Sequence, residues 1–527
     1  MESSYLWATV NLAAHDTCLS LLTASVLYLL LWRLYTFTIR PWLRPSDPKE
    51  YPYWIPVVGH LHSFFKNSSR LISDAKRYFH DTGEPFALSV AGQKWYVLTK
   101  AEDVTATYRM EHLSYDIFAV EVMRMIGVSE DGITKAFDTT SHPSKKHLVR
   151  LCKEYQLEQL SPGNRLEHLV ESSIILMNSH LNISTILARG QNWYATQPNP
   201  SSPAITVSLY QWISDLFIDL GTRAYFGPHL LSLEPGLIPT FMSFESLSWQ
   251  AMYQYPRLLS TSMIAAKEKL VFAMQSFFST PPAHRPETSW FISQIEAETT
   301  RLAISPSDSA IFFFQLFWSI NGNTRKAPFW ILSYLLCHFP HLLPAIRSET
   351  APAILPDGSG GDGGGVNIAY LTDDKLCPVL NSIWEETTRL TAFAASVRFL
   401  THDVHLGGKV LRRGNRLMMP QRQLHFDAKS FGKTAAEFDP DRFLRDPGLK
   451  RHPSFRPFGG GTTMCPGRNL AKQTTLAFVA MVLDRFDVEL DPPGQKFPRP
   501  AEGKPSIGLV DVTEGEDLRV KLTPRRR

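Results

Sequence analysis

"FGGGTTMCPGRNLA", from Phe458 to Ala471, places three glycines, one cysteine and a Pro-Gly pair directly before a helical pattern. Glycines permit a close approach of the backbone, and the Pro466-Gly467 pair favours a turn. The residues from Asn469 to Phe486 then have the period of an amphipathic helix. Cys465 therefore stands at a helix start, where the helix dipole and free backbone N–H groups favour a thiolate over a thiol.

Three roles are open for Cys465. A free cysteine is most often a small buried apolar side chain. A nucleophilic cysteine needs a histidine base, but none of the 17 histidines forms a recognisable partner motif. A lone thiolate suits a metal that already has other ligands, such as iron in a porphyrin.

The loop resembles the haem-binding loop of the cytochrome P450 family, F-x-x-G-x-(R/H)-x-C-x-G. Phe458, Gly461, Cys465 and Gly467 match this pattern. The resemblance implies that Cys465 is the axial ligand of iron in heme b, with Phe458 and Gly461 in the cofactor-binding loop. Thr463 stands where the family usually has an arginine or histidine that pairs with a haem propionate. The loop of the sterol 7-alpha-hydroxylase branch also lacks that arginine.

Two further motifs follow the family's order. "WEETTRL" carries Glu386 and Arg389 on one helical face, and "FDPDRF" carries Arg442, 23 residues before Cys465. A Glu and an Arg at this spacing usually form a solvated surface pair. The resemblance instead implies a structural triad of Glu386, Arg389 and Arg442. Arg398, in "SVRFL", matches a family position that often reaches a haem propionate.

The family's tryptophan–arginine helix has no clear counterpart. The segment "HPSKKHLVRL" has His142 in the place of the tryptophan. Lys145, Lys146 and Arg150 are alternative partners for a propionate, and each is ordinarily a surface residue.

A long apolar helix is predicted from a cap at Ser305, with Pro306 in its first turn, to Phe339. Pro328 should kink it. Polar and charged residues in its middle would be costly in lipid, so the pattern favours a buried helix that crosses the core rather than a membrane span.

The middle of this helix contains "SINGNT", from Ser319 to Thr324. Family members that split dioxygen usually carry an acid and an alcohol here, which relay protons; Gly322-Asn323 replaces that pair. The resemblance predicts Asn323 and Thr324 as the catalytic residues. This departure, with the nearby "APFW", resembles the branch that holds cholesterol 7-alpha-hydroxylase, sterol 12-alpha-hydroxylase and prostacyclin synthase. That branch contains both hydroxylases and an oxygen-independent isomerase.

The amino-terminal run from Cys18 to Ile39 is almost uninterruptedly apolar, with one charge at Arg33, and is long enough to span a bilayer. A cleaved signal peptide is the alternative, but no basic region precedes the run and no small-residue cleavage site follows it. Arginines follow the run and none precedes it, which predicts a cytosolic body. We expect a lumenal tail and anchor helix over residues 1–40, a proline-rich stalk over 41–56 and a catalytic domain over 57–527.

The predicted fold class is mainly α with a small β region, the cytochrome P450 fold behind an N-terminal transmembrane helix. The β region should comprise a hairpin within 86–100 and strands within 396–424. No strand pattern is convincing between these two segments before about residue 350. The glycine-rich residues 356–366 are expected to form a flexible surface insertion.

Charge and cysteine content exclude other classes. The 54 basic and 50 acidic residues are spread along the chain, which predicts no nucleic-acid partner. The five cysteines are far apart and odd in number, which argues against a disulfide framework, and no CxxC pair suggests zinc.

The resemblance implies a haem-thiolate monooxygenase in the endoplasmic reticulum membrane that takes electrons from NADPH-cytochrome P450 reductase. Aromatic residues predict a hydrophobic small-molecule substrate such as a terpenoid, steroid or polyketide, contacted by residues 312–324, Phe393 and residues 115–130. The sterol-oxidase-like branch and the glycine-rich insertion resemble biosynthetic oxidases of filamentous fungi, which suggests secondary metabolite biosynthesis. An oxygen-independent isomerase or dehydratase and a non-catalytic haem-binding sensor are the alternatives.

Overall fold

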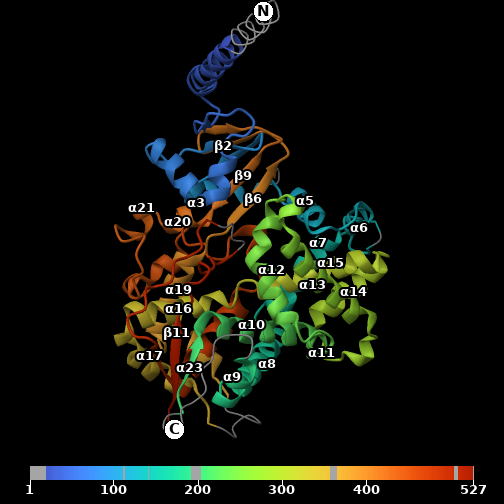
Figure 1. The fold of residues 1–527 in the computed structure, drawn as a ribbon, viewed down its shortest axis with the longest axis vertical. Helices are drawn as coiled ribbons and strands as arrows, with labels where there is room; N and C mark the ends of the chain where they lie inside the picture. The colour runs from blue at the N-terminus through green and yellow to red at the C-terminus, as the bar shows by residue number, and fades with distance from the viewer. Residues whose placement is uncertain are drawn as a thin grey trace, which may run out of the picture. The chain divides into compact units, whose positions relative to one another are not determined.

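A computed structural model describes residues 19–110, 113–140, 142–190, 203–356, 365–503 and 508–525. These residues form two compact units: one contains the chain up to Tyr115 together with Ser396–Pro420, and the other contains Asp116–Ala395 and the chain from Gln421 onward. The chain is mostly helical with small sheets, as predicted (Figure 1). The predicted lumenal tail and most of the glycine-rich insertion lie outside the described residues.

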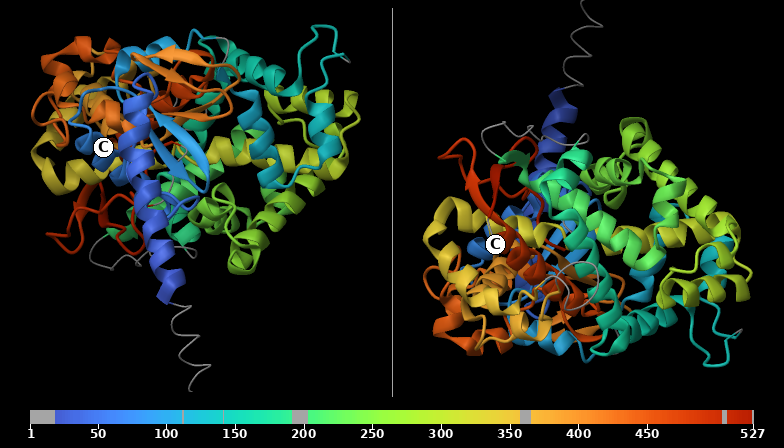
Figure 2. Two further views of the ribbon diagram at one scale, coloured as in Figure 1. Left: turned by 90° about the horizontal axis from the view of Figure 1, so that it is seen from above. Right: turned by 90° about the horizontal axis from the view of Figure 1, so that it is seen from below.

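The first unit begins with an apolar helix, Leu19–Leu43, which has a mean hydropathy of 1.4 and is long enough to cross a membrane. Figure 2 shows it as one continuous rod. It includes a π-helical turn, Tyr35–Ile39, and α2 (Arg40–Leu43), so it runs past the predicted end at residue 40. Pro41 lies in α2, and its ring would clash with the carbonyl of Phe37, which is in the wider π turn.

The first unit also contains two helices, α3 (Leu61–Tyr78) and α4 (Ala101–Thr107), and a six-stranded sheet. The strands, in sheet order, are β1 (Lys49–Glu50), β2 (Phe86–Val90), β3 (Gln93–Val97), β9 (Arg416–Pro420), β6 (Ala395–Leu400) and β4 (Leu113–Ser114). The two strands β7 (Val404–Leu406) and β8 (Lys409–Leu411) pair with each other.

The predicted hairpin is confirmed, because β2 and β3 pair antiparallel. Its turn residues Ala91 and Gly92 have φ values of 51° and 75°, the left-handed conformation that tight hairpins require. The strands predicted within 396–424 end at Pro420, and Gln421–His425 is a short helix, α20. Glutamine, arginine and leucine in this stretch favour helix over strand.

The second unit is a helical body with one three-stranded sheet. Its helices before the long apolar segment are α5 (Asp116–Ile126), α6 (Glu130–Ala136), α7 (Leu148–Leu160), α8 (Asn164–His180), α9 (Ile183–Arg189), α10 (Leu209–Phe226), α11 (His229–Leu233), α12 (Leu237–Met252), α13 (Thr261–Ser279) and α14 (Trp290–Arg301). The later helices are α15 (Pro306–Asn321), α16 (Lys326–His338), α17 (Leu343–Thr350), α18 (Ile368–Thr372), α19 (Pro378–Thr391), α20, α21 (Ala428–Phe431), α22 (Arg442–Arg445) and α23 (Arg468–Arg485).

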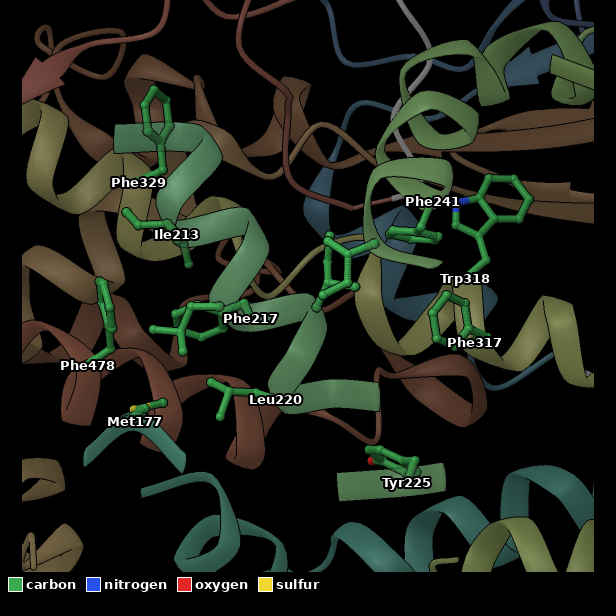
Figure 3. Close-up of a cluster of buried hydrophobic side chains, with 14 of the residues drawn as sticks. Met177, Ile213, Phe217, Leu220, Tyr225, Phe241, Phe317, Trp318, Phe329 and Phe478 are labelled. Carbon is green, nitrogen blue, oxygen red and sulfur yellow. The ribbon is translucent and has the colours of Figure 1, made fainter. Parts of the chain in front are cut away.

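The core of this unit forms where α10 packs against α15 and α23 (Figure 3). Phe217 of α10 lies 5.3 Å from Phe478 of α23, and Phe226 of α10 lies 5.9 Å from Phe317 of α15, measured between ring centroids. Residues 474–483 of α23 are all buried, so this helix is enclosed on every side rather than amphipathic as predicted.

The three-stranded sheet was not predicted. It contains β5 (Ile205–Ser208), β10 (Phe486–Leu490) and β11 (Arg519–Pro524), in the order β10-β11-β5. All four residues of β5 are buried, so the strand has none of the alternation that marks a half-buried strand in sequence.

The long helix of the core is broken where a single kinked helix was predicted. α15 ends at Asn321 and α16 begins at Lys326, so the break precedes Pro328 rather than falling at it. A proline ring clashes with the carbonyl four residues earlier, which is that of Thr324. The Thr324 carbonyl instead accepts a 3.3 Å bond from the N–H of Ala327. The predicted cap is confirmed, since the Ser305 hydroxyl accepts from the Asp308 N–H.

Candidate functional site

The loop around Cys465 is closed by its own backbone. Gly459 and Gly461 have positive φ values of 73° and 59°, which L-residues with a side chain rarely adopt. The N–H of Cys465 donates to the carbonyl of Phe458 at 3.0 Å. A Cβ on Gly467 would lie 3.8 Å from the Cys465 sulfur, so glycine there leaves the thiol open. The loop therefore presents one exposed thiol just before α23.

Phe458 ties this loop to α19. Its ring stacks on that of Trp384 at 6.4 Å with an interplanar angle of 25°. Trp384 is buried and precedes Glu386 by two residues on the same helix. The loop is thereby packed directly on the helix that carries two of the triad residues.

The protonation of Cys465 reflects opposing effects. Nearby protein atoms remove part of the hydration of the sulfur, which raises the pKa of the thiol, whereas the Gly467 N–H and the Arg468 charge lower it by less. The helix start therefore acts in the predicted direction, but the net shift of the pKa favours the thiol over the thiolate. A metal ion that binds a cysteine deprotonates it outright, so the pKa in the metal-bound protein is set by the metal.

The donor set of the site fits a haem. Among the described residues, no three His, Cys, Asp or Glu side chains come together as a metal site. Cys465 thus offers one ligand, and a metal held there must bring its others, as iron in a porphyrin does. Burial raises the pKa of Tyr225, near the end of α10, and the thiolate form of Cys465 raises it further, so the sulfur lies near the core helices.

Glu386, Arg389 and Arg442 lie together and are buried. Arg389 makes a bidentate pair with Glu386 through bonds of 2.8 and 2.7 Å. The Nε of Arg442 contacts the two oxygens of the same carboxylate at 3.1 and 3.2 Å. One carboxylate therefore holds two guanidinium groups from segments 53 residues apart.

The remaining guanidinium N–H groups of this triad bind backbone carbonyls of the loop that precedes Cys465. Arg389 donates to the carbonyls of His425 and Ala435 at 2.7 and 2.6 Å, and Arg442 donates to that of Thr434 at 2.8 Å. The triad thus fixes the path of residues 425–437.

The candidate propionate partners are dispersed. Arg398 lies on β6 in the first unit, with its guanidinium 6.0 Å from the ring of Tyr108 and 5.6 Å from that of Tyr115. Burial lowers its pKa. The Thr463 hydroxyl donates to the Gly460 carbonyl.

The other candidates, in the turn before α7 and in its first turn, contact other residues or lie outside regular structure. Lys146 and Arg150 both contact the Glu154 carboxylate, at 2.7 and 3.5 Å. Lys145 adopts a positive φ of 53° in the turn before α7.

α15 carries accessible polar residues near its carboxyl end. Ser319 is exposed and Gln315, one turn earlier, is half-buried, whereas Phe317 and Trp318 are buried. Asn323, four residues after Ser319, is half-buried and lies in the turn that follows α15. Residues four apart lie on one face of a helix. This face is the one that could meet a ligand.

The Asn323 side chain meets a segment near the carboxyl end of the chain. Its Oδ1 accepts from the N–H of Leu509 at 3.2 Å, and its amide lies against Gly508. Thr324, the next residue, is half-buried. Neither Gly508 nor Leu509 was predicted, because no local pattern links them to a helix 186 residues away.

Two buried cations that follow Thr324 were also missed. Arg325 and Lys326 both pair with Glu245 of α12, at 2.8 and 2.9 Å. Both also approach Asp511, at 3.7 and 3.4 Å. Adjacent Arg and Lys in an apolar run could have indicated buried partners, but the sequence does not say which carboxylates these are.

The residues predicted to contact substrate have mixed environments. Phe312 is buried on α15. Phe393 lies under the Arg422 guanidinium at 4.8 Å, and its N–H donates to the Gly508 carbonyl at 3.0 Å. Residues 116–126 of the third predicted region form α5.

A cavity of about 290 Å³ lies away from this chemistry, beside α9, α10 and the segment before α12. Its charged residues are paired with one another: Arg189 with Asp215 and Asp219 at 2.6 and 2.9 Å, and Arg223 with Asp219 at 2.6 Å. These pairs occupy the groups that a ligand would need, so this cavity is not the candidate site.

A single thiol before α23 lies in a loop that packs on α19, and the Glu-x-x-Arg pair of α19 holds the segment before that loop; this arrangement fits a haem-thiolate protein. Residues 314–513 match the family model described as Cytochrome P450. The match covers 200 of the 527 residues and agrees with the cytochrome P450 family that the sequence predicted.

Relatives extend over most of the chain. The cytochrome P450 monooxygenase calL of Penicillium decumbens is 26% identical over 466 residues, which cover 81% of this chain and 84% of the relative. The 7-alpha-hydroxycholest-4-en-3-one 12-alpha-hydroxylase of Oryctolagus cuniculus is 24% identical over 513 residues, which cover 91% of this chain and 94% of the relative.

A solved structure shares the fold. Retinoic acid-bound cyanobacterial CYP120A1 superimposes with a TM-score of 0.66 at 17% identity, covering 91% of this chain and 99% of that chain. Fungal monooxygenases and sterol 12-alpha-hydroxylases among the relatives agree with the branch that the loop and the long helix predicted.

Proposed function

We propose that this protein is a haem-thiolate monooxygenase that inserts one oxygen atom from dioxygen into a hydrophobic small molecule. The observation that carries the proposal is the Cys465 thiol, exposed before α23 in a loop that packs on Trp384 of α19, the helix that also carries Glu386 and Arg389. The haem, proposed to be heme b, would supply the redox chemistry when bound.

Each predicted residue has a proposed task. Cys465 would bind the iron, and Phe458 and Gly461 would hold the loop in the shape that presents the sulfur. Glu386, Arg389 and Arg442 would keep residues 425–437 in place, and so act on haem retention rather than on the reaction. Arg398 is proposed as a propionate partner, because a guanidinium can hold a carboxylate through two parallel hydrogen bonds.

The distal tasks are proposed for Asn323 and Thr324. An amide is not an acid, but its NH₂ group donates hydrogen bonds, and a threonine hydroxyl both donates and accepts. These side chains would position water or a substrate hydroxyl that moves protons. A positioned proton transfer is typically worth roughly 10²- to 10⁴-fold in rate.

The substrate is proposed to be a terpenoid, steroid or polyketide of secondary metabolite biosynthesis. The support is the aromatic surroundings of α15 together with the names of relatives, which include fungal monooxygenases and a 12-alpha-hydroxylase of a cholestenone. Ser319 and Gln315 add polar groups to the accessible face of α15, which suits an apolar skeleton that already carries oxygen.

The proposed location is the endoplasmic reticulum membrane, with residues 1–40 as tail and anchor, 41–56 as stalk and 57–527 as a cytosolic catalytic domain. The apolar helix Leu19–Leu43 supports an anchor. NADPH-cytochrome P450 reductase is the proposed electron donor.

A second candidate is an oxygen-independent isomerase or dehydratase, which Gly322-Asn323 in place of the acid–alcohol pair favours. The two functions differ in what they consume. A monooxygenase forms product only with oxygen and reductase, and consumes NADPH in proportion to substrate. Product formed without oxygen or reductase would support the isomerase and overturn the monooxygenase.

The ligand assignment has its own test. We expect the reduced carbon monoxide complex of the full-length protein to show the absorption band that marks thiolate ligation, and Cys465→Ala to lose it. Cys377→Ala, which removes a buried thiol directly before α19, is the matched control and should keep the band. Retention of the band by Cys465→Ala would overturn the assignment.

A further inference from the structure

We propose that the segment Gly508–Asp511 fixes the orientation of the Asn323 amide, so that Asn323 presents N–H donors and no acceptor to the ligand side of α15. Gly508, Lys326 and Asp511 would therefore be positioning residues for the distal site. This inference rests on the proposed placement of Asn323 beside the haem and deepens it.

The orientation of the amide follows from its one bond to the backbone. The N–H of Leu509 can only donate, so the atom 3.2 Å from it must be the oxygen of the Asn323 side chain. No described residue accepts a hydrogen bond from the Nδ2 of Asn323. Asn323 is half-buried, so its NH₂ group remains available as a donor of two hydrogen bonds.

Gly508 is the position that allows this contact. A Cβ placed there would lie 2.2 Å from Oδ1, 2.4 Å from Cγ and 2.7 Å from Nδ2 of Asn323. Real Cβ atoms do not approach other atoms so closely. Any side chain at residue 508 would thus push the amide off Leu509 or displace the segment.

The segment itself is held from several sides. The Gly508 carbonyl accepts from the N–H of Phe393 at 3.0 Å, and the N–H of Val510 donates to the Thr391 carbonyl at 2.7 Å. The indole N–H of Trp330, on α16, donates to the Val510 carbonyl at 3.0 Å. Because Gly508 and Val510, on either side of Leu509, are hydrogen-bonded through their backbones, the Leu509 N–H has little freedom to rotate away from Asn323.

Buried charge anchors the end of the segment. Asp511 accepts from the Tyr210 hydroxyl and lies 3.4 Å from the ammonium of Lys326. The same ammonium donates to the Leu509 carbonyl at 3.4 Å. Lys326 is three residues beyond Asn323, and its backbone N–H donates to the Asn323 carbonyl at 3.0 Å. Lys326 therefore binds both partners of the amide hydrogen bond: its ammonium binds the Leu509 carbonyl, and its backbone N–H binds the Asn323 carbonyl.

Glu245 completes this cluster. It accepts from Arg325 and Lys326, and Arg325 also donates to Ser214 at 2.9 Å. Arg325 and Lys326 together balance the charges of Glu245 and Asp511. Removing one member leaves the buried charges of the cluster unbalanced, which is costly.

The chemical consequence is a fixed polarity. An amide free to rotate could offer either its oxygen or its nitrogen, and would suit donors and acceptors alike. An amide held by Leu509 offers donors, which stabilise an electron-rich oxygen and do not bind a hydroxyl hydrogen. The site would thus favour ligands that accept hydrogen bonds at this point.

The test uses the full-length protein and the infrared C–O stretching frequency of carbon monoxide bound to the reduced haem, which falls when a donor faces the ligand. We expect Asn323→Leu to raise the frequency, Gly508→Ala to raise it nearly as far, and Asp511→Asn to raise it less. Lys326→Arg, which keeps the cation, should stay close to the parent. Gly448→Ala, at an exposed turn beside the movable Asp446 side chain, and Asp487→Asn, at an exposed ion pair, are the matched controls and should not shift it.

A second measurement does not need the haem. In hydrogen exchange, Asn323→Leu should speed exchange of the Leu509 amide at least about tenfold, the effect of losing roughly 1.4 kcal/mol of hydrogen bonding. Unchanged exchange in Asn323→Leu, or unchanged C–O frequencies in both Asn323→Leu and Gly508→Ala, would overturn the inference.

The failure of the proposed function is separable from these outcomes. If product forms anaerobically without reductase and the expected frequency shifts are also seen, the monooxygenase proposal fails. The inference that the Asn323 amide has a fixed orientation then still holds. If the parent protein lacks the thiolate band, the haem-thiolate assignment fails. The exchange rate of the Leu509 amide would then test the hydrogen bond to Asn323 by itself.

Discussion

The second unit contains the Glu386 triad and the cluster around Arg325 and Lys326, two groups of buried charges that are built differently. In the triad, Glu386 meets two arginines, and the remaining guanidinium N–H groups bind backbone carbonyls. In the other cluster, Arg325 and Lys326 meet two carboxylates, Glu245 and Asp511. The triad binds the backbone of residues 425–437. The second cluster joins side chains from α10, α12, the turn after α15, the first residue of α16 and the segment after Gly508.

The difference shows what each cluster can tolerate. The triad depends on one carboxylate, so its loss leaves two cations buried together. The second cluster has two carboxylates and two cations, so each ion keeps one partner when another is removed. We therefore expect the triad to be the more fragile of the two.

The largest effect is expected for Glu386→Ala. Breaking a buried charge pair by removing one partner costs about 3–5 kcal/mol, and here both guanidinium groups lose their carboxylate. The free energy of unfolding in urea and the fraction of protein that retains haem should both fall. Glu514→Ala, at an exposed turn, is the control. Equal stability of the two variants would contradict this role of the triad.

A smaller effect is expected for Lys326→Met. Glu245 and Asp511 keep Arg325 as a partner, so we expect a loss of about 1–3 kcal/mol in the free energy of unfolding. Combining Lys326→Met with Asp511→Asn should cost less than the sum of the single changes, because the pair is removed together. Additive losses would show that the two side chains do not interact.

The pH dependence of stability gives a further test at the triad, because Arg389 binds the backbone of the buried His425. Burial, and then the Arg389 charge, lower the pKa of His425 from 6.5 to about 3, and its Nε2 accepts the Arg456 N–H at 2.9 Å. The unfolded chain then binds the extra proton below about pH 6.5 while the folded protein does not, so stability falls as the pH drops toward 3.

At pH 5 this single histidine accounts for a loss of about 2 kcal/mol relative to neutral pH. His425→Gln keeps an acceptor and should flatten the decline between pH 7 and pH 5 by that amount in denaturant titrations. His180, whose pKa falls to about 4, contributes in the same direction and remains in both proteins. If the free energy of unfolding of His425→Gln declines between pH 7 and pH 5 as steeply as that of the parent, His425 is not the group that causes the decline.

The smallest effect is expected at the surface of the first unit. Arg412 pairs with Asp47 and Asp403 at 2.8 and 3.0 Å, but all three side chains are open to solvent to some degree. Water and salt weaken such pairs. Arg412→Ala should leave the unfolding midpoint unchanged at high salt, in contrast to both buried clusters.

The proximal half of the site could be predicted because its residues follow one another at fixed spacing. The loop of Cys465, the Glu386–Arg389 pair and Arg442 lie within one stretch of 82 residues, from Trp384 to Cys465. The distal half could not, since Asn323 depends on Gly508 and Leu509, and the buried cations depend on Glu245. Contacts between segments so far apart leave no periodic pattern in sequence.

The fold shows the same division. The hairpin β2–β3 and the cap at Ser305 are local features, and their turn and capping residues predicted them. The strand β5 pairs with residues 519–522, more than three hundred positions later, and it is too short and too buried to alternate. Pro328 was recognised as a helix breaker, but its effect falls on the preceding turn, because the clash is with the Thr324 carbonyl.

The guanidinium of Arg33, in the apolar helix, contacts residues that follow that helix in the chain. Its guanidinium donates to the Tyr53 carbonyl at 2.6 Å and lies 4.1 Å from the ring of Trp54. Trp54 is 66% exposed. Indole fluorescence depends on the polarity around the ring, so the emission of Trp54 can act as a built-in reporter of whether this end of the helix meets lipid headgroups or water.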